Sequence, residues 1–232
     1  MVGPHIRKAK WIWQSITGSE AEAIEVEHAV GRDLAREIRR RLEPDPEPQA
    51  RQLLSEIGDR LSACVANKLR TFSFEAVKGT EPNAFALPGG LIFVSRSLLE
   101  LCEWNQDEVA FILGHEMGHV IRGHAMDRII SSSAIAVGSG ATPIRGLLAG
   151  WLRTVGVKFL ESAYCQDMEL EADTLGARLA VAAGYNPDAP SQLLCRLFEL
   201  SQSADQFNLG NYFSSHPAFN VRIENVNRLL RR

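Results

Sequence analysis

Apolar positions in the first quarter of the chain recur at the period of an α-helix. Over 20–42 they fall three and four residues apart, and Ser19 with Glu22 has the spacing of a capping box, so this run predicts a helix. The segment EPDPEP at 43–48 ends it, because each proline lacks a backbone donor and restricts the residue before it. A second helix is predicted over about 49–68.

The pattern changes to that of short strands between 71 and 94. TFSFEAV alternates, NAFAL follows a Glu-Pro break, and LIFV follows Pro-Gly-Gly. From Ser95 onward the helical signals return. Asn105 and Glu108 have capping-box spacing, and they predict the start of a long helix over about 106–130.

A stretch without charged side chains follows, at 129–144. It is rich in Ser and Gly and contains a proline, whereas a membrane-spanning helix needs about 20 predominantly apolar residues. We interpret 131–156 as a connection or as a lid over a cleft. Three more helices are predicted, over about 157–183, 189–203 and 218–231.

These patterns predict an α+β fold that is mainly helical and has a small mixed sheet. The chain has 232 residues, of which 45% are hydrophobic and 23% charged, and this size and composition suit one globular domain. We expect an N-terminal extension at 1–18 and a single domain at 19–232. Its parts in order are a helical layer at 19–70, strands at 71–94, a helix at 106–130, the connection at 131–156, a helix at 157–183 and C-terminal helices at 189–232.

Composition excludes some classes of partner and leaves the compartment open. A formal net charge of −3 creates no field that would gather nucleic acid, so none is expected as a partner. The N-terminus has no apolar core of a signal peptide, so the chain is expected to be soluble and, by default, cytoplasmic. A trimmed start would instead fit a periplasmic or membrane-associated protein, and Trp11 and Trp13 leave open a peripheral contact with a membrane. Four scattered cysteines favour free thiols over two disulfides; they are Cys64, Cys102, Cys165 and Cys195.

The sequence HEMGH at 115–119 indicates a metal site. His115 and His119 stand one helical turn apart on one face, a separation that lets both imidazoles reach one tetrahedral zinc. Glu116 lies beside them, where it could take a proton from the attacking water and hand it to the leaving amine. So short a pattern also arises by chance on amphipathic helices, and more ligands are therefore needed to support the reading.

A third ligand is available in YCQDMELEAD at 164–173. Glu169 and Asp173 stand four residues apart on one helical face, whereas Glu171 points to the other side and is expected to face solvent. We predict that Glu169 binds the metal and that Asp173 orients a ligand imidazole through its other nitrogen. A solvated acidic helix face is the alternative. The small residues Ala172 and Gly176 favour close packing against another helix.

Two further histidines, His124 and His216, lie outside these motifs in the sequence. His124 is five residues beyond His119, about 140° around a continuous helix, so it should point away from the metal and be structural. His216 stands in SSHPAFNVR, and Arg222 follows at a spacing that could bring both positive groups to one place. Such a pair could stabilise the oxyanion of a tetrahedral intermediate, and a surface His and Arg in a capping loop is an equal alternative.

With these residues assembled, the chain resembles the gluzincin metallopeptidases, the group that includes the CAAX prenyl proteases, HtpX and BepA. The likeness is greatest to the compact minigluzincin and mitochondrial Oma-type branch. It runs from about Glu27 to Leu230. The segments that carry it are NAFALPGGLIFVSRSLL at 83–99, ILGHEMGHVIRGH at 112–124, ELEAD at 169–173, GYNPDA at 184–189 and HPAFNVR at 216–222.

The resemblance implies a zincin-like fold with one Zn²⁺ per chain, in which an edge strand of the sheet borders the cleft. It implies His115, His119 and Glu169 as ligands, Glu116 as general base and acid, and Asp173 as support. His216 and Arg222 would then assist the transition state. The segment Asn83, Ala84, Phe85, Ala86 and Leu87 resembles the family's edge strand, to which an extended polypeptide adds as an antiparallel strand.

Two departures from the family pattern shape the expected function. Family members commonly carry Ser-Arg shortly before the ligand glutamate, where this chain has Cys165 and Gln166. The membrane-spanning helices of the prenyl proteases and HtpX are also missing, which disfavours processing of prenylated peptides. We therefore predict a zinc endopeptidase that cuts extended or misfolded polypeptides in protein quality control. The alternatives are a latent or weakly catalytic zinc-binding, chaperone-like module, and a helical interaction protein without metal.

Overall fold

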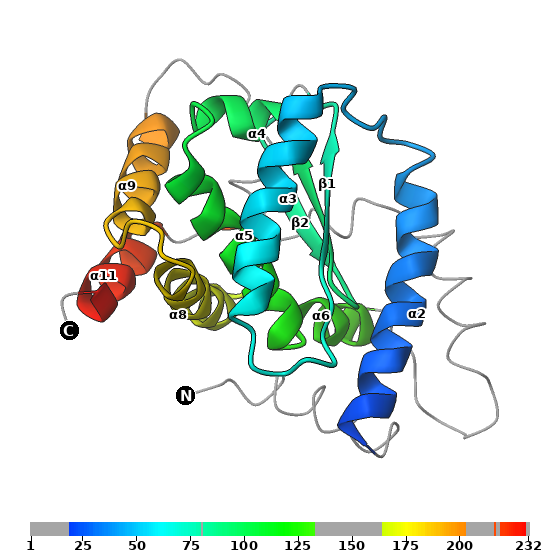
Figure 1. Ribbon diagram of the computed structural model, residues 1–232. Helices are drawn as coiled ribbons and strands as arrows, with labels where there is room; N and C mark the ends of the chain where they lie inside the picture. The colour runs from blue at the N-terminus through cyan, green and yellow to red at the C-terminus, as the bar shows by residue number, and fades with distance from the viewer. Residues whose placement is uncertain (1–18, 80, 133–163, 203–215, 217–218, 231–232) are drawn as a thin grey trace.

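The computed structural model describes residues 19–79, 81–132, 164–202, 216 and 219–230 (Figure 1). The expected extension at 1–18 and most of the expected lid at 131–156 lie outside these ranges. In this part of the chain helices dominate and three short strands form one sheet, which confirms the predicted fold class. The elements in order are α2 (Glu20–Ile38), α3 (Pro48–Ala63), β1 (Ser73–Val77), β2 (Ala84–Leu87), β3 (Leu91–Ser95), α4 (Arg96–Leu101), α5 (Gln106–Ile121), α6 (His124–Ser132), α8 (Gln166–Ala182), α9 (Ala189–Gln202) and α11 (Phe219–Leu230).

The sheet is mixed, with β3 in the centre, parallel to β1 and antiparallel to β2. The segment that leads out of the proline-rich turn covers the outer edge of β1. There Pro44 forms an isolated bridge with Val77, and the Asp45 N–H donates to the Ala76 carbonyl at 2.9 Å. Within the described residues, β2 has no strand on its other side, so it is an edge strand.

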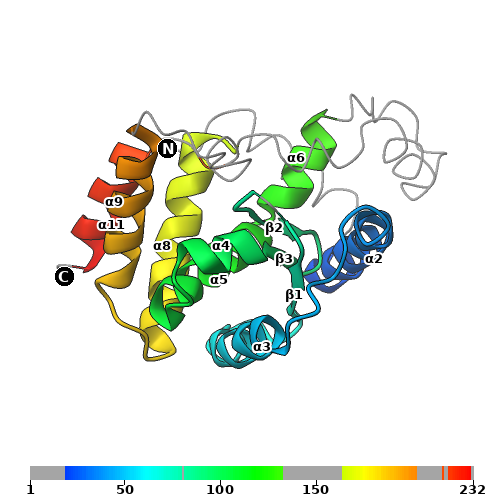
Figure 2. The same ribbon diagram turned by 90° about the horizontal axis from the view of Figure 1, so that it is seen from above.

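Apolar side chains pack on both faces of the sheet and form two cores. Ile92 and Val94 of β3 face α3 and α5, whereas Leu91 and Phe93 face α2 and α6. This two-sided burial explains the continuous apolar run LIFV, because a strand that is solvated on one face would alternate. Figure 2 shows the resulting succession of elements, from α11 and α9 through α8 and α5 to the sheet and α2.

Helices α5 and α8 pack unusually closely, and they carry the three predicted metal ligands together with Glu116 and Asp173. A Cβ added to Gly114 would lie 2.8 Å from the Gly176 carbonyl oxygen, and one added to Gly118 would lie 2.9 Å from that of Ala172. The two backbones therefore touch along one stripe of small residues. This contact confirms the expectation that Ala172 and Gly176 mark packing against another helix.

The structure divides the long helix predicted over 106–130. Helix α5 ends at Ile121, Gly123 adopts a φ of +76°, and α6 begins at His124. A residue with a side chain rarely adopts this backbone conformation, and glycine does so without steric cost. The expectation that His124 lies about 140° around the same helix from His119 is therefore wrong.

Other helix boundaries also differ from the predicted ones. Helix α2 keeps the predicted capping box, since Ser19 accepts from the Glu22 N–H and the Glu22 carboxylate accepts from the Ser19 N–H, but the helix ends at Ile38. Helix α8 begins at Gln166 rather than near 157, with Cys165 as its N-cap. All four cysteines are free thiols in the structure, with Cys102 buried and Cys165 exposed. Within the described residues, the helices are all too short or too polar to cross a membrane.

Candidate metal centre

Three predicted ligands converge where α5 faces α8. The Nε2 atoms of His115 and His119 lie 3.0 Å apart, because the two residues occupy one face of α5 one turn apart. Glu169 reaches them from α8, with Oε1 3.2 Å from His119 Nε2 and Oε2 3.6 Å from His115 Nε2. All three side chains are fully buried.

His216 joins this cluster from the segment before α11. Its Nδ1 atom lies 3.2 Å from His115 Nε2 and 3.1 Å from Glu169 Oε1. One donor atom from each of the four residues falls within 4.8 Å of all the others. The spacing allowed His216 and Arg222 to come together or to lie on the surface. The structure brings them together in the buried site, where Arg222 Nη1 donates to the His216 backbone carbonyl at 3.0 Å.

The spacing of these donor atoms fits zinc. Two zinc–ligand bonds of about 2.0–2.1 Å at the tetrahedral angle place their donor atoms about 3.3 Å apart. Five of the separations between donors, measured to the nearer Glu169 oxygen, run from 3.0 to 3.6 Å and are close to this value, and the whole set lies within 4.8 Å. Imidazole and carboxylate groups are also the donors that zinc accepts in proteins.

A second carboxylate, that of Asp173, lies against the His115 ring. Asp173 Oδ1 lies 2.8 Å from His115 Nδ1, on the side of the ring away from the other ligands. Arg222 holds this carboxylate with two hydrogen bonds of 2.7 Å, from Nε and Nη2, and its Nη1 lies 3.1 Å from Glu169 Oε2. The Arg222 side chain is fully buried, so it supplies a cation that water does not screen.

Glu116 is buried beside the cluster. Neither of its carboxylate oxygens has a hydrogen-bond partner in the described part of the chain, and the nearest ionisable nitrogen is His216 Nε2 at 3.5 Å from Oε1. Burial raises the pKa of Glu116 above its ordinary value of 4.5. A buried carboxyl group without partners costs folding free energy, which points to a role in chemistry.

The protonation of two of the three predicted ligands, His119 and Glu169, suits metal binding. Burial holds the pKa of His119 well below its ordinary value, which keeps this imidazole neutral. Burial alone would raise the pKa of Glu169, but the charges of His216 and Arg222 outweigh it and hold this pKa well below 4.5. A neutral imidazole and an ionised carboxylate are the forms that bind a metal ion.

Sequence reasoning missed two residues beside His119. Tyr164 stacks on its ring with centroids 3.9 Å apart and planes inclined by 20°, and Arg128 lies over the Tyr164 ring at 4.0 Å. His124, expected to point away, places Nδ1 3.0 Å from His119 Nδ1. The Glu171 side chain is 35% exposed, and its Oε2 lies 3.8 Å from His124 Nε2 and 3.6 Å from Arg122 Nε. The divided helix hid these contacts, because helical spacing does not extend across Gly123.

The predicted substrate strand is the edge strand β2, which packs against α5. Asn83 pairs with Ser95, since the Ser95 N–H donates to the Asn83 carbonyl at 2.8 Å. Hydrogen-bonded pairs alternate along an antiparallel ladder, so Phe85 also bonds to β3. Ala84 and Ala86 consequently direct their N–H and C=O groups to the open side.

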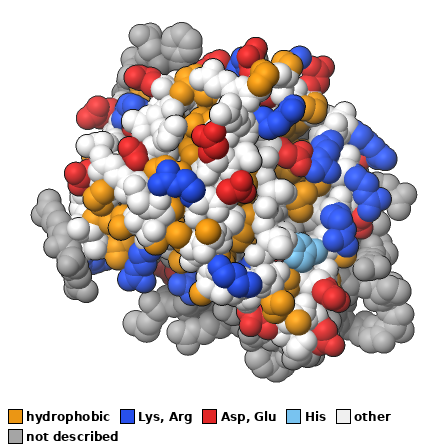
Figure 3. All heavy atoms as spheres, viewed as in Figure 1, with side chains coloured by type: hydrophobic (Ala, Val, Ile, Leu, Met, Phe, Trp, Pro, Cys, Tyr) orange, Lys and Arg blue, Asp and Glu red, His pale blue; other side chains and the backbone are white. Residues whose placement is uncertain are grey.

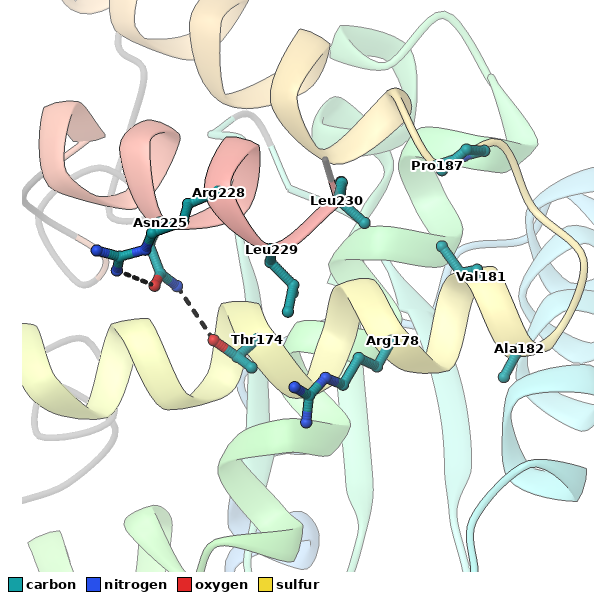
Figure 4. A pocket seen from close by; sticks show the side chains of 9 residues that line it. All are labelled: Thr174, Arg178, Val181, Ala182, Pro187, Asn225, Arg228, Leu229 and Leu230. Carbon is teal, nitrogen blue, oxygen red and sulfur yellow. Dashed lines mark hydrogen bonds between the residues drawn. The ribbon is translucent and has the colours of Figure 1, made fainter. Parts of the chain in front are cut away.

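The outer surface adds little to this site. Acidic and basic side chains are interspersed over the face that Figure 3 shows. A groove of about 620 Å³ lies between α8 and α11, on the side of α8 away from the ligands, with Thr174, Val181 and Leu229 among its lining side chains (Figure 4). Asn225 crosses one end of it and donates to Thr174 Oγ1 at 3.1 Å.

A helix that presents HEMGH to a glutamate on a second helix, beside a small mixed sheet, defines a zincin-like metallopeptidase. Comparison with known proteins agrees, because the sequence profile of Peptidase family M48 matches residues 48–230. The chain belongs to this family.

Curated relatives include mitochondrial and bacterial metallopeptidases. The chain is 31% identical over 162 residues to the mitochondrial metalloendopeptidase OMA1 of Arabidopsis thaliana, a match that covers 69% of this chain and 32% of that protein. It is 28% identical over 183 residues to the metalloprotease LoiP of Escherichia coli, covering 74% and 70% of the two. It is also 28% identical over 198 residues to the beta-barrel assembly-enhancing protease of Yersinia pestis, a match that covers 78% of this chain and 39% of that protein. The chain thus spans about a third of the Arabidopsis relative's length.

Proposed function

We propose that this protein is a zinc-dependent endopeptidase that hydrolyses extended or misfolded polypeptides in protein quality control. One observation carries the proposal: three donor side chains with tetrahedral spacing lie beside a buried carboxyl group that has no hydrogen-bond partner in the described residues. Structural zinc sites have no use for such a group, whereas hydrolysis requires a base within reach of the attacking water.

Each residue has a defined part in the proposed reaction. His115, His119 and Glu169 would hold Zn²⁺, which lowers the pKa of a bound water to about 7 and polarises the scissile carbonyl. Glu116 accepts a proton from the attacking water and then donates it to the leaving amine, and its raised pKa favours this return step. Asp173 fixes the ring of His115, and Arg222 holds Asp173 in place.

The substrate would bind as an added strand. The outward N–H and C=O groups of Ala84 and Ala86 would pair with an extended polypeptide, and the adjacent position of α5 would bring its backbone toward the ligands. Backbone pairing is independent of sequence, which suits a peptidase that acts on many unfolded chains. Phe85, which is half-buried and stacked on Phe93, would keep the edge flat.

Substitution of Glu116 tests the proposal. Glu116→Gln keeps the shape of the side chain but removes the base, so we expect one bound zinc per chain and a loss of casein or quenched-peptide cleavage of at least about a hundredfold. Glu100→Gln, an exposed change on α4, is the matched control and should leave both measurements unchanged. Cleavage at the wild-type rate by Glu116→Gln, or absence of zinc from the wild type, would refute the proposal.

The position of His216 favours a second candidate, a latent form of the same enzyme. Closed zinc sites have four protein ligands, whereas catalytic sites keep one position for water, and His216 Nδ1 stands where a fourth ligand would be. His216→Ala separates the two roles. A rise in cleavage rate would establish that His216 occludes the site, and a fall would establish the predicted assistance to the transition state.

A further inference from the structure

The two ligand imidazoles have different partners on their outer nitrogens. His115 Nδ1 faces the carboxylate of Asp173, whereas His119 Nδ1 faces another imidazole, that of His124, at 3.0 Å. The ring centroids of His119 and His124 are 5.1 Å apart, and their planes cross at 68°. His124 is only 3% exposed, so bulk water does not compete for this contact.

Counting protons on the two rings fixes the direction of this hydrogen bond. If Nε2 of His119 binds the metal, the one hydrogen of the neutral ring must sit on Nδ1. His119 is then the donor and His124 Nδ1 the acceptor. The hydrogen of neutral His124 must therefore sit on Nε2, which lies 3.8 Å from Glu171 Oε2. The negative charge of Glu171 favours that tautomer.

The break in the helix makes this contact possible. The positive φ of Gly123 turns the chain so that α6 begins at His124, which returns toward His119 instead of continuing around α5. Tyr164 covers one face of the His119 ring. The hydrogen bond to His124 thus fixes the orientation of the His119 ring within its plane, and the stacked Tyr164 ring keeps it from tilting.

We propose that His124 is a positioning residue for the metal centre, which accepts the Nδ1–H of His119 and thereby fixes its tautomer and ring orientation. This proposal rests on the proposed function, because it takes His119 as a metal ligand. Hydrogen-bond partners of ligand imidazoles commonly contribute a factor of 10–100 to metal affinity. His124 would do for His119 what Asp173 does for His115.

Two variants of His124 separate positioning from packing. His124→Phe retains a flat ring but has no acceptor, and we expect it to bind zinc about 10–100-fold more weakly than the wild type in competition with a chromophoric chelator. His124→Asn places an amide oxygen near the position of Nδ1, so its zinc affinity should return to within about threefold of the wild type. His28→Phe, on α2 and remote from the site, is the control and should bind zinc normally.

The outcomes distinguish this proposal from the one on which it rests. Wild-type affinity in His124→Phe would overturn the positioning role, and so would an equal loss in His124→Asn and His124→Phe, because that would show a packing effect. Failure of the wild type itself to bind zinc would instead refute the proposed function. Visible absorption of the cobalt-substituted proteins adds a readout of ligand geometry, and we expect a changed spectrum for His124→Phe alone.

Discussion

Replacement of Gly176 by alanine should disturb both the fold and the metal centre. An added Cβ would lie 2.6 Å from the backbone nitrogen of His115, whereas ordinary contact begins at 3.4 Å. Helices α5 and α8 would have to separate by the difference, about 0.8 Å. The atoms in the way belong to backbone, which cannot rotate aside as a side chain can.

This separation would act directly on the ligands. If α8 retreated as a rigid body, the 2.8 Å hydrogen bond between His115 and Asp173 would lengthen to about 3.6 Å, beyond hydrogen-bond range. Overpacking of a core costs about 1–3 kcal/mol, while alanine gains about 1 kcal/mol over glycine in helix propensity. We expect a net loss of up to about 2 kcal/mol in the free energy of unfolding, together with about 10–100-fold weaker zinc binding.

Thermal unfolding and chelator competition on the purified proteins would measure these effects. A loss of 2 kcal/mol lowers the Tm of a chain of this size by about 4–8 °C. Arg178→Ala, on the exposed face of α8, is the control and should change stability by less than about 0.5 kcal/mol. If Gly176→Ala instead raised the Tm, as propensity alone predicts, and left zinc affinity unchanged, the close contact between the helices would be refuted.

Three further predictions, two on substitutions and one on chemical labelling, test other parts of the structure. Asp173→Asn should weaken zinc binding about 10–100-fold and lower the free energy of unfolding by about 1–3 kcal/mol, measured by urea unfolding, because the amide nitrogen cannot accept one of the two hydrogen bonds from Arg222, which then keeps only Glu169 as its counter-charge. Burial alone would raise the pKa of Asp45, but hydrogen bonds from Arg96 and a backbone N–H outweigh it and lower this pKa below 3.8. The ionised Asp45 therefore stabilises the fold above about pH 4, and this contribution is lost as the pH falls through the folded-state pKa. In acid unfolding, the stabilities of the wild type and Asp45→Asn should converge as the pH falls. A difference that stays constant with pH would contradict this. Burial raises the pKa of the Cys102 thiol to about 12, so iodoacetamide at pH 8 should label exposed Cys165 and spare Cys102 in mass spectra of the folded protein, and equal labelling would contradict the burial.

The sequence predicts the centre of the site well because its chemistry follows short-range spacing. His115 and His119 share a helix face, as do Glu169 and Asp173, and a helical period carries this information without knowledge of the fold. The pairing of the two helices was also accessible, because Gly176 lies among these residues and small residues permit close approach. These predictions need only the local geometry of a helix and the rule that small side chains let two helices approach closely.

What could not be predicted depends on a single backbone conformation. The sequence around Gly123 continues the apolar pattern of a helix, so periodicity extends the helix through it, and only the positive φ in the structure shows the turn. That turn decides where His124 points. Tyr164 is equally hidden, because its stacking on His119 joins residues that are far apart in sequence and that no motif links.

The buried charges explain why a divalent cation suits this cluster. Without metal, the carboxylates of Glu169 and Asp173 contact one fixed cation within the described residues, Arg222, and this group of three therefore carries one negative charge in excess. The pKa values of Glu116 and His115 are both raised. Burial raises that of Glu116. Burial alone would lower that of His115, but the hydrogen bond to Asp173 and the charge of Glu169 outweigh it. Both shifts favour binding a proton, which is how a dry site neutralises an excess of negative charge. A bound Zn²⁺ would make these protons unnecessary: its two positive charges with that of Arg222 equal the three negative charges of Glu169, Asp173 and an ionised Glu116. The metal would therefore leave Glu116 in the form that a general base needs.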